Sequence, residues 1–382
     1  MSLTTLQGVK VLDIGHYFAG PYASRLLADL GADVIKLEPL DGDLLRPTVK
    51  PFNGAQRGKR DIAVNLKHPR GIEIGHRLAA WAHVVSHNMR PGAAERLNMD
   101  YETVRAVNPS VIYAYAPGWG SSGPDAALPG FAPLFSGYVG LHHEAAGDGN
   151  PPMAPIGNED NGNGLLGATA ILMALYHRAR TGEGQYLEHP QLNATLMMAM
   201  HLLRRPDGSV VGSAGLDHER LGGHPLDRVY RARDGWVCLS ARTGAEFARL
   251  CAVPGFESAA GKEGRDLEES LAKVFATAPA ASWVALLDAH DVPAEVPLGP
   301  EAPQVLLHDP ERRRDGRVEE YEHPRWGTTQ DVAVLVRLSA AGERPGRPAP
   351  EIGQHTREIL GDLGYPEDDI DALFSEGVVR GT

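Results

Sequence analysis

The sequence predicts an α/β fold in which an open parallel sheet carries helices, with a smaller α+β unit farther along the chain. Two observations predict it. Within the first 38 residues a strand pattern, a helical pattern and a second strand pattern follow one another, which is the order of a βαβ unit. The same alternation continues to about residue 117. Strands joined by crossover helices pair in parallel, so an open parallel sheet follows.

The first βαβ unit justifies this most clearly. Residues 9–14 form a short run of β-type residues. Apolar residues then recur with helical spacing between Tyr22 and Leu30, and Gly31 stands where a helix C-cap is expected. Residues 32–38 form the second strand pattern.

The later elements follow in the same manner. Strands are predicted at 62–66, 84–88, 111–115 and 185–188, and helices at 69–82, 101–107, 165–178 and 191–203. The apolar helix at 165–178 and the Met-rich helix at 191–203 are both expected to lie in the core.

The last 180 residues predict a smaller unit and a returning tail. Residues 205–223 are rich in Gly and Asp and predict a linker, and a DG turn joins the strands of a hairpin at 229–240. A strand-like run occupies 332–336, and two short acidic helices are expected at 356–363 and 366–374. The expected domains are therefore 1–204, 205–330 and 331–382.

Composition excludes several classes of protein. The 382 residues carry 37 basic and 49 acidic side chains, a formal net charge of −12, which argues against a dedicated nucleic-acid binder. The two cysteines, Cys238 and Cys251, form no CxxC pair. No signal peptide is visible and no apolar stretch is long enough to span a bilayer. We therefore expect a cytoplasmic protein that binds neither nucleic acid nor membrane.

The loop after the first strand does not match a dinucleotide fingerprint. Residues 15–21 read GHYFAGP rather than GxGxxG, so a nicotinamide dehydrogenase is disfavoured. The loop precedes a helix, where backbone N–H groups are able to hold an anion. No GxSxG elbow is present, and the histidines, including His16, His87, His142 and His143, lack a convincing metal-ligand spacing.

An acidic residue in a Gly- and Asn-rich segment is the main catalytic candidate. Asp160 lies in the segment 157–164, GNEDNGNG, directly before an apolar helix. One interpretation is a helix cap or dipole partner. The other is a carboxylate nucleophile, because the flanking glycines permit close approach of a ligand. Glu159 is the immediate rival, and the residue pattern leaves these alternatives open.

Several motifs in a fixed order resemble one family. They are LQGVKVLD at 6–13, AGPYA at 19–23, LADLGADVIKLEP at 27–39, KRDI at 59–62, NMRPG at 88–92, ERL at 95–97, RTGEGQ at 180–185 and GQHT at 353–356. Together they resemble the family III CoA-transferases, the CaiB/BaiF group. The resemblance covers most of the chain and is weakest at about 205–330.

The resemblance implies a fold and a reaction. It implies a large Rossmann-like domain with a smaller inserted α+β domain, and an interlocked homodimer. It also implies that Asp160, which lies the family distance before RTGEGQ, attacks an acyl-CoA thioester. A mixed anhydride and then an aspartyl-CoA thioester would pass CoA to a carboxylic acid. Acyl-CoA, CoA and the acid are then substrates, with no permanently bound cofactor and no metal.

The resemblance also implies site residues. The CoA contacts would be His16, Tyr17, Ala19, Lys36, Asn88, Met89, Arg96 and Leu97, with the lysine and arginine near the nucleotide phosphates. Phe18, which stands where some members have Gln, and Phe131 would contact the acyl group, and Gly222 and Gly223 would form a closing loop. The aromatic side chains favour an apolar or bulky acyl group.

Two other functions stay open. An α-methylacyl-CoA racemase belongs to the same superfamily, but its members carry a histidine where this chain has Phe131, followed by Ala132 instead of the usual Asp. Racemisation needs such a base, so this interpretation is disfavoured. A CoA-binding module without turnover is the other alternative.

Overall fold

The computed structural model describes residues 4–48, 50–154, 159–212, 215–342 and 347–381, which fall into two compact units. Unit 1 comprises residues 1–139, 156–199 and 307–382, and unit 2 comprises residues 140–155 and 200–306. The expected boundaries at 204 and 330 differ from these.

Two long-range contacts account for the difference in boundaries. Segment 140–155 bonds to the later part of unit 2, where Asp148 N donates to Leu216 O at 2.9 Å. The hairpin of β13 (Val318–His323) and β14 (Gly327–Val332) holds Arg57 of unit 1, because Glu319 lies 2.8 Å from its guanidinium. The strand predicted at 332–336 is wrong beyond Val332, where β14 ends.

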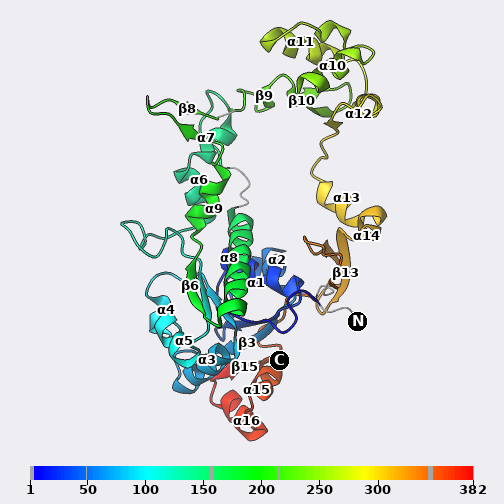
Figure 1. Cartoon of the computed structure of the whole chain (residues 1–382). Helices are drawn as coiled ribbons and strands as arrows, with labels where there is room; N and C mark the ends of the chain where they lie inside the picture. The colour runs from blue at the N-terminus through cyan, green and yellow to red at the C-terminus, as the bar shows by residue number, and fades with distance from the viewer. Residues whose placement is uncertain (1–3, 49, 155–158, 213–214, 343–346, 382) are drawn as a thin grey trace. The chain divides into compact units, whose positions relative to one another are not determined.

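A seven-stranded sheet forms the centre of unit 1, in the order β15-β3-β2-β1-β4-β5-β6 (Figure 1). The strands are β1 (Lys10–Asp13), β2 (Asp33–Glu38), β3 (Arg60–Val64), β4 (Val84–His87), β5 (Ile112–Tyr115), β6 (Gln185–Glu188) and β15 (Val379–Arg380). Every neighbouring pair is parallel except β15 with β3. The predicted α/β class with a mainly parallel sheet is confirmed. The strand order reverses between β1 and β4, which makes their carboxyl ends the topological switch point of the sheet.

Helices cover both faces of this sheet. The helices of unit 1 are α1 (Ala19–Asp29), α2 (Lys50–Gln56), α3 (Pro69–Trp81), α4 (Ala93–Arg96), α5 (Tyr101–Val107), α6 (Ala132–Tyr138), α8 (Glu159–Thr181), α9 (Gln191–Met198), α14 (Pro310–Arg314), α15 (Thr356–Asp362) and α16 (Glu367–Ser375), with α13 (Ala302–His308) at the boundary. Leu27 of α1 and Ile171 of α8 belong to one buried cluster, and Ile74 of α3 and Ile359 of α15 belong to the other. Each cluster buries one face of the sheet.

Helices α1 and α8 run side by side at very short range (Figure 1). Gly164 of α8 faces Tyr22 of α1, and a Cβ on Gly164 would lie 2.3 Å from the ring atom Cδ1 of Tyr22. No real Cβ tolerates that distance, so only glycine permits this approach. Gly164, four residues after Asp160, is therefore needed so that the helix that carries Asp160 packs against α1.

We expect Gly164→Ala to destabilise the protein by about 1–3 kcal/mol, because the added methyl group forces the two helices apart. Gly162→Ala is the matched control, since nothing lies within 4 Å of a Cβ there. Alanine also favours a helix over glycine by about 1 kcal/mol. Urea unfolding of the two variants checks this. Equal free energies of unfolding for both would contradict the packing argument.

The Met-rich helix is less buried than its sequence predicts. Helix α9 ends at Met198, and Met197 and Met200 are 45% and 77% exposed. On α8, Met173 and Tyr176 are also largely exposed, while Gly167, Ile171 and Ala174 are buried. The prediction that both helices lie entirely in the core is therefore wrong. Each buries one narrow face and leaves an apolar face uncovered by the described part of this chain.

Unit 2 has its own sheet and core. An antiparallel sheet has the order β12-β11-β10-β9, with β9 (Gly222–His224), β10 (Asp227–Arg231), β11 (Trp236–Ser240) and β12 (Ala294–Glu295). Its helices are α7 (Leu141–Ala146), α10 (Gly244–Ala252), α11 (Gly264–Phe275) and α12 (Ala280–Asp288), beside the strand pair β7 (Leu203–Arg204) and β8 (Val210–Val211). The predicted hairpin is confirmed, with Arg231 opposite Trp236. Among the described residues no single helix is long and apolar enough to cross a membrane, and only the bent pair α11 and α12 passes on length and composition.

Candidate active site

A cavity of about 760 Å³ lies in unit 1 at the carboxyl ends of β1 and β4. Residues His16–Ala19, which follow β1, and Asn88–Pro91, which follow β4, line two of its sides. This is the switch point of the sheet, where open α/β folds bind their ligands. Further lining comes from the segment Pro39–Leu45 after β2, from Ala116 and Gly118 after β5, from residues between Ala126 and Phe135, from Asp160 and Asn161 at the start of α8, and from Gln191 at the start of α9.

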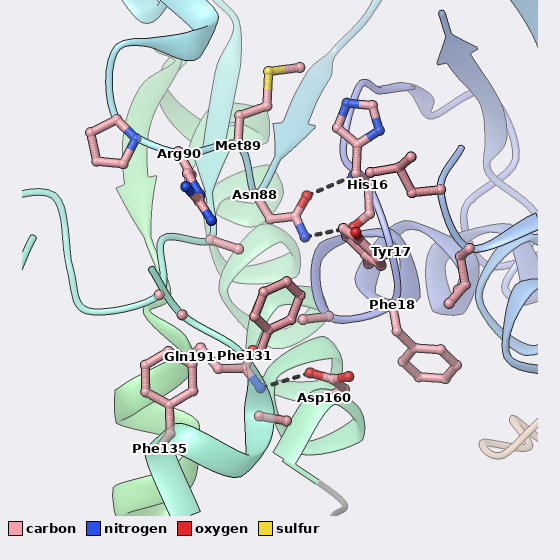
Figure 2. Close-up of a pocket in the computed structure, with 18 of the residues that line it drawn as sticks. His16, Tyr17, Phe18, Asn88, Met89, Arg90, Phe131, Phe135, Asp160 and Gln191 are labelled. Atoms are coloured by element: carbon pink, nitrogen blue, oxygen red, sulfur yellow. Dashed lines mark hydrogen bonds between the residues drawn. The ribbon is translucent and has the colours of Figure 1, made fainter. Parts of the chain in front are cut away.

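Asn88 fixes the shape of the first loop (Figure 2). Its Oδ1 accepts from the backbone N–H of His16 and its Nδ2 donates to His16 O, both at 2.7 Å. The N–H of Tyr17 donates to Asp43 at 3.2 Å, and Tyr17 adopts a left-handed φ of 59°. The N–H groups of His16 and Tyr17 therefore bond to side chains, and the anion site expected at the helix start stays a prediction. The loop presents its side chains to the cavity instead.

Lys36 lies outside the lining of this cavity. Its side chain is fully buried, donates to Gly15 O and pairs with Asp43 at 3.1 Å. Burial lowers the pKa of Lys36, but the carboxylates of Asp13 and Asp43 raise it above its usual value, so the ammonium stays charged. The lysine supports the loop from beneath. The contact of Lys36 with CoA stays a prediction, and its burial between Gly15 and Asp43 places it beneath the loop and not in the cavity lining.

The predicted contacts on the second loop divide into two groups. Met89 lines the main cavity and also a second cavity of about 370 Å³, which Leu97 lines as well. His16 lies in the lining of both cavities. Arg96 is exposed on α4 and lines neither of them. The structure thus brings Met89 and Leu97 to this region and leaves Arg96 outside it.

Aromatic side chains form one wall of the main cavity. The rings of Tyr17 and Phe131 meet edge to face, with their centroids 5.7 Å apart, and Phe18 stacks on Tyr22 at 5.0 Å. Gly222 and Gly223 belong to β9 in unit 2, whereas the cavity belongs entirely to unit 1. Their expected role as a closing loop stays a prediction.

Asp160, and not Glu159, lies in the cavity lining. Helix α8 begins at Glu159, so Asp160 stands in its first turn. Glu159 is only 2% exposed and is absent from the lining. Asp160 is half-buried, and its Oδ1 accepts from Gln191 Nε2 at 2.9 Å (Figure 2). Residues 157 and 158 of the segment lie outside the described residues. The place of Asp160 in the first turn agrees with the dipole-partner interpretation, and its bond to a side chain of α9 is compatible with the nucleophile, so both interpretations stay predictions.

Three buried polar side chains continue from Asp160. Gln191 Oε1 accepts from Asn163 Nδ2 at 2.9 Å, and Asn163 Oδ1 lies 3.1 Å from His189 Nδ1. We call Gln191, Asn163 and His189 the amide relay. Sequence reasoning missed all three. The available signal was the position of His189 and Gln191 directly after the strand at 185–188, where parallel strands deliver functional side chains.

The surroundings of Asp160 raise the pKa of its carboxyl group above the usual value. Burial raises the pKa of Asp160, the hydrogen bond from Gln191 lowers it, and the nearby Glu159 raises it, with a net increase above 3.8. A carboxylate whose charge is disfavoured by burial is a better nucleophile than a fully solvated one. The arrangement therefore supplies one oxygen held by Gln191 and a second oxygen, Oδ2, without a protein hydrogen bond among the described residues.

Family, sequence and structure comparisons all match this chain to the same family of proteins. The model of "CoA-transferase family III" matches residues 6–356. The mouse succinyl-CoA:glutarate CoA-transferase is 29% identical, over 99% of this chain and 91% of its own. Human α-methylacyl-CoA racemase is 27% identical, over 98% and 97%. A CaiB/BaiF family protein from Brucella suis has a similar solved structure, with a TM-score of 0.78 and 25% identity, over 94% of this chain and 100% of that one.

Proposed function

The chain is an enzyme of CoA-transferase family III, and on that premise we propose that it moves CoA from an acyl-CoA to a carboxylic acid through covalent intermediates on Asp160. One observation carries the proposal. A half-buried carboxylate lines a cavity of about 760 Å³ at the switch point of the sheet, with one oxygen bonded to Gln191. The reaction needs no ATP, because one thioester replaces another.

The proposed reaction has four balanced steps. Oδ2 of Asp160 attacks the thioester carbon of the donor, a C–O bond forms and the C–S bond breaks to release CoA thiolate. The thiolate attacks Cγ of Asp160, which expels the donor acid as its carboxylate and leaves an aspartyl-CoA thioester. The acceptor carboxylate attacks Cγ and releases the thiolate again. The thiolate then attacks the acceptor's acyl carbon, which yields the new acyl-CoA and restores the Asp160 carboxylate.

The lining supports roles for neighbouring residues. His16, Tyr17, Ala19, Asn88 and Met89 would contact CoA, with Leu97 at the second cavity. The Tyr17–Phe131 wall would shield the anhydride from water, because a dry site prevents its hydrolysis. We keep Gly222 and Gly223 as the proposed closing loop.

We propose an apolar acyl group, because Phe18, Phe131 and Phe135 lie in the lining. The name of the mouse relative gives two dicarboxylic acyl groups instead, and Arg90 in the lining is a cation able to bind a second carboxylate. Turnover of butyryl-CoA against succinyl-CoA separates the two. A clear preference for succinyl-CoA would contradict the apolar acyl group without touching the covalent reaction.

The racemase remains the alternative because a racemase is among the relatives. A racemase needs a base opposite Asp160, and Phe131 occupies the position where the family pattern has histidine. His16 lies at the other end of the cavity (Figure 2). Uptake of deuterium at the α-carbon of the acyl group would favour the racemase. Binding of CoA without any covalent adduct would favour a non-catalytic module.

We also propose a homodimer and a cytoplasmic location. The exposed apolar side chains of α8 and α9, among them Met173, Tyr176 and Met197, support a partner subunit on this face. The two free cysteines support a reducing compartment. Sedimentation analysis tests the dimer, and a monomer at micromolar concentration would contradict it.

The covalent reaction predicts an adduct on Asp160. We expect intact-mass spectrometry after acid quench to show the protein plus acyl group or plus CoA, and hydroxylamine to convert it to a hydroxamate that maps to Asp160. An acceptor acid labelled with ¹⁸O should deliver the label to the same residue, because its oxygen bridges the second anhydride. Label-free Asp160 after many turnovers would contradict the anhydride.

A further inference from the structure

We propose that Gln191 is a catalytic residue, whose amide stabilises the oxyanion that forms on Oδ1 of Asp160 whenever a nucleophile attacks Cγ. The inference rests on the proposed covalent function and assigns a role to a residue outside the motifs that identify the family. Its basis is the amide relay of Gln191, Asn163 and His189, which ends on Asp160.

Elementary chemistry sets the direction of every hydrogen bond in the relay. An ionised carboxylate only accepts, so Gln191 turns its NH₂ group to Asp160 Oδ1. Its oxygen then faces Asn163, which donates through Nδ2. The oxygen of Asn163 only accepts, so His189 carries its proton on Nδ1. Burial lowers the pKa of His189 to about 4, which keeps the ring neutral at physiological pH.

The relay is rigid because its members are buried. Gln191 is 5% exposed, Asn163 0% and His189 2%. Gly167 makes room for the imidazole, since a Cβ there would lie 2.4 Å from His189 Cε1. A donor that is already oriented needs no reorganisation when charge develops on the acceptor, which is the property of an oxyanion hole.

The hydrogen bond from Gln191 Nε2 to Oδ1 determines which steps of the reaction Gln191 assists. When Oδ2 carries the acyl group or Cγ carries CoA, Oδ1 is the carbonyl oxygen of Asp160. Attack of the CoA thiolate forms a C–S bond at Cγ and moves the carbonyl electron pair onto Oδ1. When the pair returns, the Cγ–Oδ2 bond breaks and the donor acid leaves with Oδ2. Gln191 Nε2 already donates to Oδ1, at 2.9 Å in the resting carboxylate.

Attack by the acceptor carboxylate on the aspartyl-CoA thioester places charge on the same atom. In the steps at the acyl carbon of a substrate, the negative charge forms on the substrate's own oxygen. Gln191 donates to Oδ1 of Asp160 and not to that oxygen. Loss of Gln191 therefore slows the two steps at Cγ selectively. Asn163 and His189 act through Gln191 and are positioning residues.

The first test is Gln191→Met, which keeps the volume and removes the donor, with Thr195→Val as control. Thr195 lies buried one turn along α9, and its hydroxyl donates to the backbone of Gln191. After rapid mixing with acyl-CoA and acid quench, intact mass follows the acyl and the CoA adducts. We expect Gln191→Met to accumulate the acyl adduct and to form the CoA adduct about 100-fold more slowly. The rate of CoA-adduct formation in Thr195→Val should stay within about twofold of wild type, because the removed hydrogen bond does not reach Asp160.

Two further readouts separate catalysis from a merely structural role. The value of kcat should fall and KM for the acyl-CoA donor should fall with it, since the slowed step follows formation of the acyl adduct. The acidic limb of kcat/KM should move to higher pH in Gln191→Met, because the hydrogen bond from Gln191 lowers the pKa of Asp160. Formation of the CoA adduct at the wild-type rate would overturn the assignment.

The second test is Asn163→Asp, which changes one group and leaves Gln191 in place. The introduced carboxyl group donates to Gln191 when it is protonated, as the amide of Asn163 does. Once ionised it only accepts, which turns the Gln191 NH₂ group away from Asp160. We expect near-normal CoA-adduct formation at low pH and a defect that grows as pH rises. A defect that is independent of pH would overturn the relay.

The failure of this inference is distinguishable from the failure of the proposed function. If wild type forms no adduct with any acyl-CoA, the proposed function fails and takes this inference with it. If wild type forms both adducts and Gln191→Met forms them at the same rates, this inference alone is contradicted and the proposed function stands.

Discussion

Asp160→Asn is expected to abolish CoA transfer, with a loss in kcat on the order of 10⁴-fold or more, as for removal of other covalent nucleophiles. The asparagine oxygen still accepts from Gln191, so the geometry of the site is retained. An amide oxygen does not form the anhydride. Steady-state transfer of CoA from donor to acceptor measures the loss.

The same substitution is expected to leave the fold intact or to stabilise it. Burial raises the pKa of Asp160, which means that its ionised form is disfavoured in the folded protein at neutral pH. Removing the charge therefore does not lower the free energy of unfolding. Calorimetric CoA binding and thermal unfolding provide the control. Residual transfer within tenfold of wild type would exclude Asp160 as the nucleophile.

Lys59→Met is expected to lower the free energy of unfolding by about 3–5 kcal/mol, the usual cost of removing one partner of a buried ion pair. The Lys59 ammonium is fully buried and donates to Asp13 Oδ2 at 2.7 Å, to Pro21 O at 2.8 Å and to Gln56 Oε1 at 2.6 Å. Burial raises the pKa of Asp13, but the positive charges of Lys59 and Lys36 outweigh this effect and lower the pKa to about 2. Methionine leaves this carboxylate charged and short of a partner.

A double variant tests the cause of the loss. Asp13→Asn combined with Lys59→Met removes both charges, so it should recover much of the stability, because a neutral pair carries no unpaired charge. Chemical denaturation of both single variants and the double variant gives the coupling energy. If the double variant is as unstable as the sum of the two single variants, the ion pair does not account for the loss.

The sheet could be predicted from sequence because its signals are local, and so could the place of Asp160 at the start of a helix. The alternation of strand and helix patterns through residue 117 describes β1 to β5 with errors of a few residues, since each pattern reflects one element's own buried face. The resemblance to the family, through the spacing of Asp160 before RTGEGQ, implies its role as the nucleophile, and that role stays a prediction. Both predictions depend on neighbours along the chain.

The sequence could not show the surroundings of residues that pack against distant segments. Lys36 resembles a surface cation in the sequence, but its partners are Gly15 and Asp43 on two separate loops. Met197 resembles a core residue, yet it is 45% exposed among the described residues. The bond between Gln191 and Asp160 joins residues 31 positions apart, on helices whose packing no local pattern specifies. Burial and pairing across elements are therefore what the sequence alone left undetermined.

The contact between Arg57 and the β13–β14 hairpin has a consequence for synthesis on the ribosome. The buried guanidinium donates to Val332 O, 275 residues later, and lies within 3.0 Å of Asp331. The whole of unit 2 is translated between these two segments. Arg57 therefore lacks these partners until nearly the entire chain has emerged, so we expect unit 2 to be complete before unit 1.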